Sequence, residues 1–267
     1  MVGFGLRFGN KVAFVTGGGS GIGRAISLRL ASEGASVAVT DLVINSAKST
    51  VADIERSGGS SAAFKLDVRD AREVDLVVEG AWQRFGRIDF LVNNAGVSTM
   101  NRLVDLTDED WDFNMDVNAK GTFLVTRAAV RKMLKTDYGT ERPKIVNIAS
   151  MAGKLPGVFL VHYTASKFAV VGFTKATALE LAPHKINVNC VCPGYVGTDM
   201  QKRELVWEAK LSGSTPEKVR EGYVSQVPLG RLATPDDVAT IVAFLLSHDA
   251  DYMTGQAINI TGGQVMF

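Results

Sequence analysis

Several features that mark particular classes of protein are scarce in this sequence. Its 267 residues hold no run of the roughly 18 to 20 uncharged apolar residues that a membrane span requires, and Met1–Arg7 lacks the apolar stretch of a signal peptide. The formal net charge is only +1, so there is no basic surface excess that would indicate nucleic acid or an anionic membrane. We therefore expect a cytoplasmic protein that binds neither.

Cysteine is almost absent. The two cysteines, Cys190 and Cys192, stand one residue apart in an apolar segment. We expect them to point to opposite faces of a strand, which makes a disulfide between them implausible. No cluster of Cys or His lies nearby to form a metal site, so no metal is expected. Both are interpreted as small buried residues in a reducing compartment.

The overall composition is that of one ordinary globular domain. Hydrophobic residues make up 46% and charged residues 21%, and the 27 glycines fall at turn positions. No repeat, linker or shift in composition divides the chain. A chain of this length fits a single α/β domain, so we predict one nucleotide-binding domain over residues 1–267.

Short β-branched segments alternate with longer amphipathic ones, which predicts βαβ units and a parallel sheet. The expected strands are Val12–Thr16, Ser36–Thr40, Ser61–Leu66, Ile88–Val92, Lys144–Ile148, Asn187–Val191 and Ala257–Ile260. The expected helices are Gly21–Glu33, Ile44–Ser57, Ala71–Phe85, Asp108–Leu134, Phe159–Leu181 and Pro235–Leu246. Right-handed crossovers would place these helices on both faces of one Rossmann-type, doubly wound sheet of about seven strands.

The segment from Thr198 to Pro228 departs from this alternation. It reads as two short helices, Gln201–Lys210 and Pro216–Ser225, separated by Leu211–Ser214. An insertion at the carboxyl edge of the strands lies where ligands bind in such sheets, so we interpret residues 198–228 as a small helical substrate lid. A purely structural excursion is the alternative.

The first expected strand leads directly into the glycine-rich run Thr16–Gly23, and a helix follows. Glycines allow a tight turn and a close approach of a pyrophosphate, while the helix start offers free N–H groups. Asp41 ends the second strand, where a carboxylate can accept hydrogen bonds from the adenosine ribose and repel a 2′-phosphate. No Arg or Lys stands at Gly18–Gly21 or Leu42–Ile44. The pattern favours NAD(H) over NADP(H), although Asp41 could also cap the next helix.

Together with further motifs, these residues resemble the short-chain dehydrogenase/reductase family along the whole chain. The run Thr16–Gly23 has that family's glycine spacing, and Asn93–Gly96 follows the fourth strand as its loop does. Ser150 and the Tyr163-x-x-x-Lys167 pair match its catalytic residues, and Asn118 matches its helix asparagine. The cofactor-binding residues implied by the resemblance and by the glycine-rich run are Gly17, Ser20, Gly21, Ile22, Gly23, Asp41, Asp67, Val68, Asn94, Ala95, Gly96, Tyr163, Lys167, Pro193, Gly194, Val196 and Thr198.

Tyr163 and Lys167 stand four apart in a helical segment and therefore share a face. A phenol titrates near pH 10, and a nearby ammonium should lower its pKa, as proton exchange with an alcohol requires. Ser150 can hydrogen-bond the substrate oxygen. The resemblance implies that Lys167 also holds the nicotinamide ribose and that Asn118 holds a water behind Lys167. His162 projects away from Tyr163 and is interpreted as a pocket or interface residue.

The residues expected around the catalytic set indicate the kind of substrate. Ser98, Met100, Met151, Ala152 and Pro156–Phe159 should line the pocket, and Tyr195, Met200 and Trp207 should close it from the lid. This apolar set has few charges and no clamp for an anionic acyl carrier or sugar phosphate.

The run Asp199–Ala209 is similar to bacterial polyol, acetoin-type and cyclic-ketone reductases of the family. We therefore expect an oxidoreductase that uses NAD(H) on a small neutral secondary alcohol or ketone. A 3-oxoacyl reductase and a catalytically silent dinucleotide sensor are the alternatives. Apolar residues along Phe159–Leu181 and at Val265–Phe267 further suggest a homotetramer.

Overall fold

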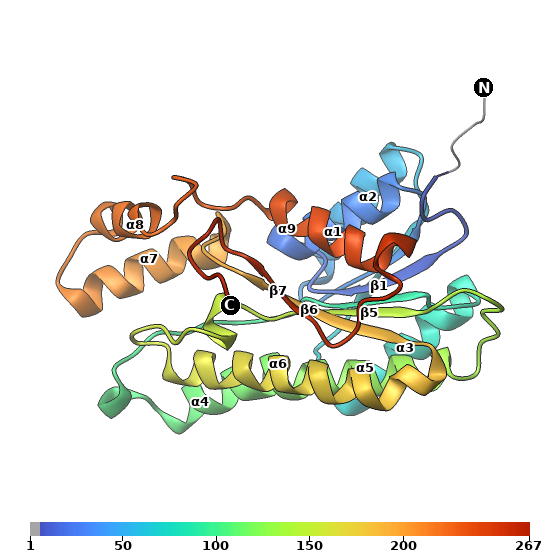
Figure 1. The fold of residues 1–267 in the computed structure, drawn as a ribbon, viewed down its shortest axis with the longest axis horizontal. Coiled ribbons are helices and arrows are strands. Elements are labelled where there is room, and N and C mark those ends of the chain that lie inside the picture. The colour runs from blue at the N-terminus through green and yellow to red at the C-terminus, as the bar shows by residue number, and fades with distance from the viewer. Residues whose placement is uncertain (1–5) are drawn as a thin grey trace.

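Seven parallel strands form one sheet. The computed structural model describes residues 6–267; Met1–Gly5, part of the segment compared with a signal peptide, lies outside the described residues. The strand order is β3-β2-β1-β4-β5-β6-β7 (Figure 1). The strands are β1 (Val12–Thr16), β2 (Ser36–Asp41), β3 (Ser61–Lys65), β4 (Phe90–Asn93), β5 (Lys144–Ile148), β6 (Asn187–Pro193) and β7 (Ala257–Ile260). This order, which reverses beside β1, confirms the predicted doubly wound fold.

Helices cover both faces of the sheet (Figure 1). On one face lie α1 (Gly21–Ser32), α2 (Ile44–Arg56) and α9 (Pro235–Leu246). On the other lie α3 (Ala71–Phe85), α4 (Asp108–Asn114), α5 (Gly121–Met133) and α6 (Val161–Leu181). Among residues 6–267, no helix is long and apolar enough to cross a membrane.

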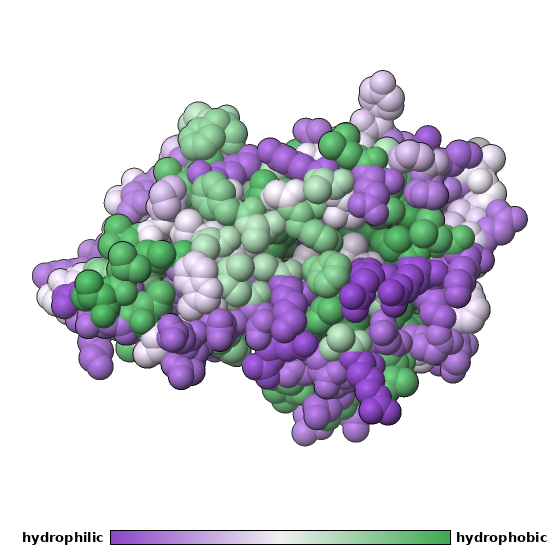
Figure 2. Space-filling model, turned by 90° about the horizontal axis from the view of Figure 1, so that it is seen from below, coloured by the Kyte–Doolittle hydropathy of each residue, from purple (hydrophilic) through white to green (hydrophobic). Residues whose placement is uncertain are grey.

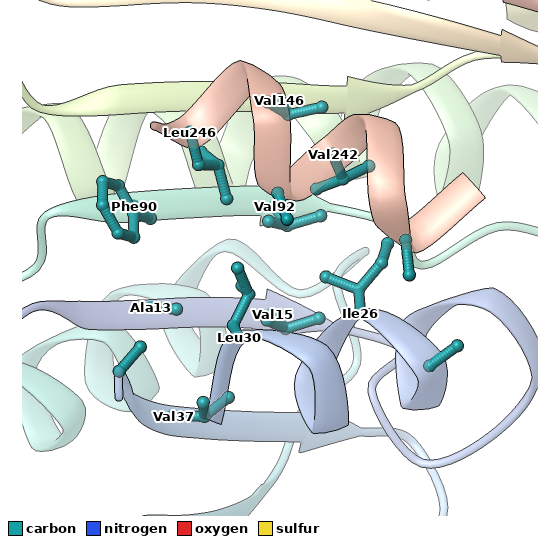
Figure 3. Close-up of a cluster of buried hydrophobic side chains, with 14 of the residues drawn as sticks. Ala13, Val15, Ile26, Leu30, Val37, Phe90, Val92, Val146, Val242 and Leu246 are labelled. Carbon is teal, nitrogen blue, oxygen red and sulfur yellow. The ribbon is translucent and has the colours of Figure 1, made fainter. Parts of the chain in front are cut away.

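The strands supply two hydrophobic cores because alternate side chains point to opposite faces. Figure 3 shows the core under α1 and α9, where side chains from both helices meet those of the central strands. Its labelled members are Ala13, Val15, Ile26, Leu30, Val37, Phe90, Val92, Val146, Val242 and Leu246. Phe14, between two of these residues, belongs to the core under α3 and α5. Burial on both faces explains why the central strands are apolar almost throughout.

Several element boundaries differ from the sequence expectation. The fourth strand begins at Phe90 and not at Ile88, because Asp89 turns its carboxylate to Val12 N, 2.9 Å away, and to Arg87. The expected helix Asp108–Leu134 is present, but its middle, Met115–Lys120, is a π-helical segment. The sixth strand continues to Pro193.

The two cysteines contradict their predicted orientation. Cys190 and Cys192 are both fully buried on one side of β6 and pack in the same cluster as Val170 and Val171 of α6. Residues two apart on a strand share a face, so the expectation of opposite faces was wrong. Both thiols are free.

The segment after β6 contains the two helices that the sequence indicated. They are α7 (Asp199–Ser212) and α8 (Pro216–Ser225), so the first is longer at both ends than predicted. Both project beyond one end of the sheet, at the left of Figure 1. A small cluster of Leu205, Ala209, Val219 and Tyr223 joins them. This pair therefore forms a separate helical unit at the carboxyl edge of the strands.

Candidate active site

The glycine-rich loop lies at the carboxyl end of β1. Gly17 and Gly21 have φ values of 60° and 50°, in the left-handed region that favours glycine. A Cβ at Gly23 would lie 2.1 Å from Gly17 O and 2.3 Å from Asn94 Nδ2, so no other residue fits there. Ile22 follows Gly21 in the first turn of α1. The loop is therefore packed closely against the start of α1.

The start of α1 suits an anion. Its N-cap, Ser20, is exposed and makes no side-chain cap hydrogen bond, and the first turn contains no acidic residue. By contrast, α3 is capped by Asp70 and α9 by Thr234. The N–H groups at the start of α1 therefore lack a side-chain acceptor, and the positive end of the helix dipole favours a phosphate.

Asn94 holds the glycine loop against β4. Its Nδ2 donates to Thr16 O at 2.9 Å and to Gly17 O at 3.0 Å. In return, the hydroxyl of Thr16 accepts the backbone N–H groups of Asn94 and Ala95, both at 2.9 Å. These bonds join the predicted phosphate loop and the predicted Asn93–Gly96 loop into one surface.

Asp41 lies at the edge of this surface. One carboxylate oxygen accepts from Gly19 N at 3.0 Å and the other from Val43 N at 2.9 Å. Asp41 does not cap α2, whose N-cap residue is Val43. The nearest basic residue of α1, Arg24, is paired with Asp53. The carboxylate is thus fixed beside the glycine loop.

The carboxylate of Asp67 interacts with a neighbouring arginine, whereas the sequence predicted a contact with the cofactor. Its carboxylate forms an ion pair with Arg69, 2.6 Å from the guanidinium, and this hydrogen bonding lowers the pKa of Asp67. The adjacent Val68 is buried and packs against Gly121, where an added Cβ would lie 2.7 Å from Val68 Cγ2. An adenine contact by Asp67 remains a prediction.

Tyr163 and Lys167 lie one turn apart on α6, as their spacing predicts. Lys167 Nζ is 5.6 Å from the centre of the Tyr163 ring and donates to Ile148 O at 3.0 Å. Lys167 is almost fully buried, and burial lowers its pKa to about 8. The pair therefore combines a phenol and an ammonium inside the protein.

The pKa of Tyr163 contradicts the expectation of a lowered value. Burial of the phenol raises its pKa, the charge of Glu204 raises it further, and only a hydrogen bond with Ser150 acts in the lowering direction. The ammonium of Lys167 is itself desolvated and faces Ile148 O, so it does not offset the burial. Tyr163 is thus held in its protonated form at neutral pH.

Ser150 follows β5 directly, at the N-cap of the short turn Met151–Gly153. Its hydroxyl accepts from Ala152 N at 3.1 Å and also lies next to the Tyr163 hydroxyl. Ala152 is buried, while Met151 keeps part of its surface exposed. The structure therefore brings together Ser150, Tyr163 and Lys167 from β5 and α6.

Asn118 lies in the π-helical segment, with its side chain completely engaged. Its Oδ1 accepts from Val97 N at 2.8 Å, and its Nδ2 donates to Val97 O and Ser166 Oγ at 2.9 Å. A Cβ at Gly96 would lie 3.2 Å from Asn118 Oδ1 and 3.5 Å from Lys167 Nζ. Asn118 is therefore close to Lys167 and positions the loop at Gly96; its water-holding role stays a prediction. The π segment, a frequent feature of functional sites, has no signal in the sequence.

The loop after β6 approaches the glycine loop. Gly194 N donates to Ile260 O at 3.0 Å, and Val196 pairs with Ala233. Thr198 caps α7, and its methyl group would be 3.4 Å from a Cβ at Gly21. The loop from Pro193 to Thr198 thus borders the surface on which a dinucleotide would lie.

The predicted pocket residues have different environments. Ser98 is buried, Tyr195 stacks on Tyr223 with ring centres 3.8 Å apart, and Met200 and Trp207 are partly exposed on α7. His162 is fully buried, with Nε2 2.6 Å from Thr99 Oγ1, and burial lowers its pKa. His162 is therefore not at the surface of the chain, where an interface would be, and its role in the pocket stays a prediction.

Glu204 is a partly exposed carboxylate of the lid that was not among the residues predicted for the site. It lies on α7, burial raises its pKa, and its charge is felt at Tyr163. The residues predicted to close the pocket from the lid were apolar or aromatic. A signal was available: Glu204 is adjacent to Leu205 and three residues after Gln201, both on the buried side of α7.

The chain is similar to known proteins along nearly its whole length. A family model described as short chain dehydrogenase matches residues 11–209. The chain is 40% identical over 261 residues to a 3-oxoacyl-acyl-carrier-protein reductase of Thermotoga maritima, covering 98% of this chain and 100% of that protein. It is 37% identical over 261 residues to a galactitol 2-dehydrogenase of Agrobacterium fabrum, covering 98% and 100%. A crystal structure of NAD+-bound xylitol dehydrogenase matches with a TM-score of 0.91 and 35% identity, covering 96% of this chain and 100% of that one.

Proposed function

Because this chain belongs to the short-chain dehydrogenase family, we propose that it uses NAD(H) to interconvert a small neutral secondary alcohol and the corresponding ketone. The observation that carries this proposal is the meeting of Ser150, Tyr163 and Lys167 beside the glycine-rich loop. The substrate would be a polyol, a hydroxyketone or a cyclic ketone. Helices α7 and α8, within residues 198–228, would act as its lid.

The described residues fit a dinucleotide. The uncapped start of α1 would hold the pyrophosphate, and the close packing at Gly23 leaves no side chain in its way. Asp41 would hold the adenosine ribose and Lys167 the nicotinamide ribose. The other residues proposed to line the cofactor site are Gly17, Ser20, Gly21, Ile22, Asp67, Val68, Asn94, Ala95, Gly96, Pro193, Gly194, Val196 and Thr198. Nicotinamide, when bound, supplies or accepts the hydride at the substrate carbon.

The protein's own residues would handle the proton. In ketone reduction, Ser150 would donate a hydrogen bond to the carbonyl oxygen, and Tyr163 would donate its proton to the same oxygen. Burial raises the pKa of Tyr163, so the phenol is already protonated at neutral pH. In alcohol oxidation, Tyr163 would accept the proton, and the ammonium of Lys167 would stabilise the resulting phenolate.

The preference for NAD(H) rests on Asp41. A carboxylate fixed beside Gly19 would repel the 2′-phosphate of NADP(H), and Arg24 is already paired with Asp53. A neutral ribose hydroxyl can instead donate a hydrogen bond to this carboxylate.

A 3-oxoacyl reductase remains the second candidate, since the Thermotoga maritima relative of that name is 40% identical. The residues expected to line the pocket oppose it, because they offer no basic clamp for the anionic group of an acyl carrier. A dinucleotide sensor without activity is less compatible with an assembled Ser150, Tyr163 and Lys167.

A screen of neutral alcohols and ketones with both nicotinamide cofactors, followed by absorbance at 340 nm, tests the proposal. We expect turnover of one or more neutral substrates, faster with NAD(H) than with NADP(H). Turnover of 3-oxoacyl thioesters alone would favour the second candidate, and cofactor binding without any turnover would favour the sensor.

We further propose that the protein assembles as a homotetramer. On the face of α5 and α6, Phe123, Phe168 and Leu179 are 41%, 46% and 80% exposed. Figure 2 looks onto the helical layer that contains α5 and α6 and shows hydrophobic areas across it. The C-terminal Met266 and Phe267 are also exposed. Such apolar area on helices that already bury another face favours contact with further copies of the chain.

A further inference from the structure

The loop that follows β4, residues 96–102, runs from the catalytic lysine to the proposed lid. At its start, a Cβ at Gly96 would lie 3.5 Å from Lys167 Nζ. At its end, the guanidinium of Arg102 donates to Leu211 O, in the last turn of α7, at 3.0 Å. We call this segment the connecting loop. A shift of the connecting loop would therefore change the space between the catalytic residues and the lid.

The connecting loop is attached to the helical layer at alternate residues. The backbone N–H and C=O of Val97 are both bonded to the side-chain amide of Asn118. The N–H of Asn101 donates to Phe159 O, just before α6, at 3.0 Å. Thr99, midway between these two attachments, is held through its side chain. The hydroxyl of Thr99 therefore fixes the middle of the loop.

This hydroxyl joins two buried side chains from different helices. Thr99 Oγ1 lies 2.6 Å from Nε2 of His162, on α6, and accepts from Nδ2 of Asn114, on α4, at 2.9 Å. Asn114 Nδ2 also donates to Asp110 O at 2.9 Å, which fixes the orientation of the amide. His162 and Asn114 are both 0% exposed. Thr99, His162 and Asn114, which we call the polar link, therefore attach the connecting loop to α4 and α6.

The histidine of the polar link is neutral at pH 7. Burial lowers the pKa of His162, although the carboxylate of Asp110 acts in the opposite direction. Because Thr99 already accepts from Asn114, its single hydroxyl proton is available to Nε2 of the neutral ring. The other ring nitrogen, Nδ1, has no partner within the described residues. Loss of the Thr99 hydroxyl would therefore leave a buried ring without a hydrogen bond, which disfavours the present position of the loop.

The polar link lies between the catalytic helix and the predicted wall of the pocket. His162 directly precedes Tyr163 on α6. Thr99 stands between Ser98 and Met100, both of which the sequence predicted to line the pocket. The hydrogen bonds that hold the catalytic lysine and serine do not involve the link. A change in the link can therefore displace the pocket wall while the catalytic groups keep their own supports.

We propose that His162 and Thr99 are positioning residues, which set the wall of the pocket at Ser98 and Met100 for the substrate. This inference rests on the proposed function and adds a determinant of substrate binding to it. His162 acts through Thr99 and the connecting loop. Since the cofactor site is held by other contacts, loss of the link weakens substrate binding and leaves cofactor binding intact.

The test removes the hydroxyl of Thr99 in the full chain. Thr99→Val removes the bond to His162, and Thr99→Ser keeps it. Thr164→Val is the matched control, because the hydroxyl of Thr164 is also buried on α6 but has no partner within the described residues. With the best neutral substrate of the screen, we expect Thr99→Val to raise KM at least about tenfold, with kcat and NADH affinity within about threefold of the parent. Thr99→Ser and Thr164→Val should keep KM within about threefold of the parent.

Equal KM values in Thr99→Val and Thr164→Val would overturn the positioning role, and so would a loss confined to kcat. A parallel loss of NADH affinity in Thr99→Val would show a general role in the fold and would also overturn it. A second pair of variants changes the ring itself. His162→Phe removes the acceptor and should raise KM as Thr99→Val does, whereas His162→Gln, whose amide can bond Thr99, should raise it less.

Hydrogen exchange of residues 97–102 in the NADH-loaded protein needs no turnover. Faster exchange in Thr99→Val than in Thr164→Val supports the link, and equal exchange contradicts it. A protein that turns over no alcohol or ketone would therefore refute the proposed function, while hydrogen exchange still decides whether the polar link holds the loop.

Discussion

At the scale of single residues, the candidate site contains ionisable groups whose pKa values are shifted from their usual values. Burial lowers the pKa of Lys167, raises that of Tyr163 and raises that of Glu204. Each shift disfavours the charged form of its group. Several ionisable groups with shifted pKa values in one place are typical of functional sites, where residues needed for activity often reduce the stability of the fold.

The free-energy cost of burying the charged ammonium of Lys167 can be measured with the variant Lys167→Met. Lys167 has a folded-state pKa of about 8 against a usual value of 10.5. Below pH 8 the lysine is charged in both folded and unfolded protein, so its desolvation cost is fully present. Between about pH 8 and 10.5 the folded protein releases the proton first, and the cost disappears as pH rises. Lys167→Met should therefore raise the free energy of unfolding by about 1–3 kcal/mol at pH 7.

Urea unfolding of both proteins at pH 7 and near pH 10 checks this, with activity expected to be lost in the variant. A variant less stable than the parent at pH 7, or a gain that grows with pH, would contradict the buried, charged state assigned to Lys167.

Asp41→Ala should relax the cofactor preference. Removing the carboxylate beside Gly19 removes the repulsion of a 2′-phosphate, so the ratio of NADH to NADPH affinity should fall at least about tenfold. Fluorescence titration with both cofactors measures the ratio. Glu55→Gln, an exposed change of equal charge on α2, is the control. A ratio that stays at the parental value in Asp41→Ala would remove Asp41 from the cofactor site.

At the scale of elements, local signals decide how well the sequence predicts the structure. The helices α3 and α9 have the predicted bounds because Asp70 and Thr234 cap them clearly. The start of β4 was misplaced because Ile88 continues the apolar pattern, while a distant partner, Val12, engages Asp89. The π-helical segment Met115–Lys120 results from tertiary packing, which periodicity does not reveal.

Gly23→Ala tests the contact between the glycine loop and α1. A Cβ there would lie 2.1 Å from Gly17 O, so the loop must move and NADH affinity should fall by at least about tenfold. The matched control is Gly80→Ala, inside α3, where the nearest atom to a Cβ is Phe64 Cε1 at 3.8 Å. This control should keep the parental affinity and gain up to about 1 kcal/mol of stability. Equal NADH affinity in the two variants would show that the packing at Gly23 is not needed for cofactor binding.

At the scale of the whole molecule, the doubly wound fold was predictable because its strands and helices alternate regularly along the chain. The meeting of Ser150, Tyr163 and Lys167 was also predicted, through motif spacing. The polarity of the lid was not, because it depends on which side of α7 is buried, a long-range property. The buried position of His162 likewise depends on contacts with Thr99 across the fold.

The exposed apolar face of α5 and α6 leads to a prediction about assembly. Sedimentation should give a mass near four times the 28.6 kDa of one chain. Phe168→Glu, on α6, should shift the protein to smaller species, because burying a charge at an apolar contact is costly. Leu76→Glu, at an exposed position of α3, should not. A monomeric parent protein would contradict the proposed tetramer.

The central claim is that Tyr163 exchanges the proton with the substrate, and that cofactor binding does not depend on its hydroxyl. Tyr163→Phe removes only the hydroxyl, and its most direct measurement is steady-state turnover together with NADH binding by fluorescence. We predict NADH affinity within about threefold of the parent, and turnover of the best substrate from the screen at least about 100-fold lower. Turnover near the parental rate in a variant that binds NADH normally would contradict the account.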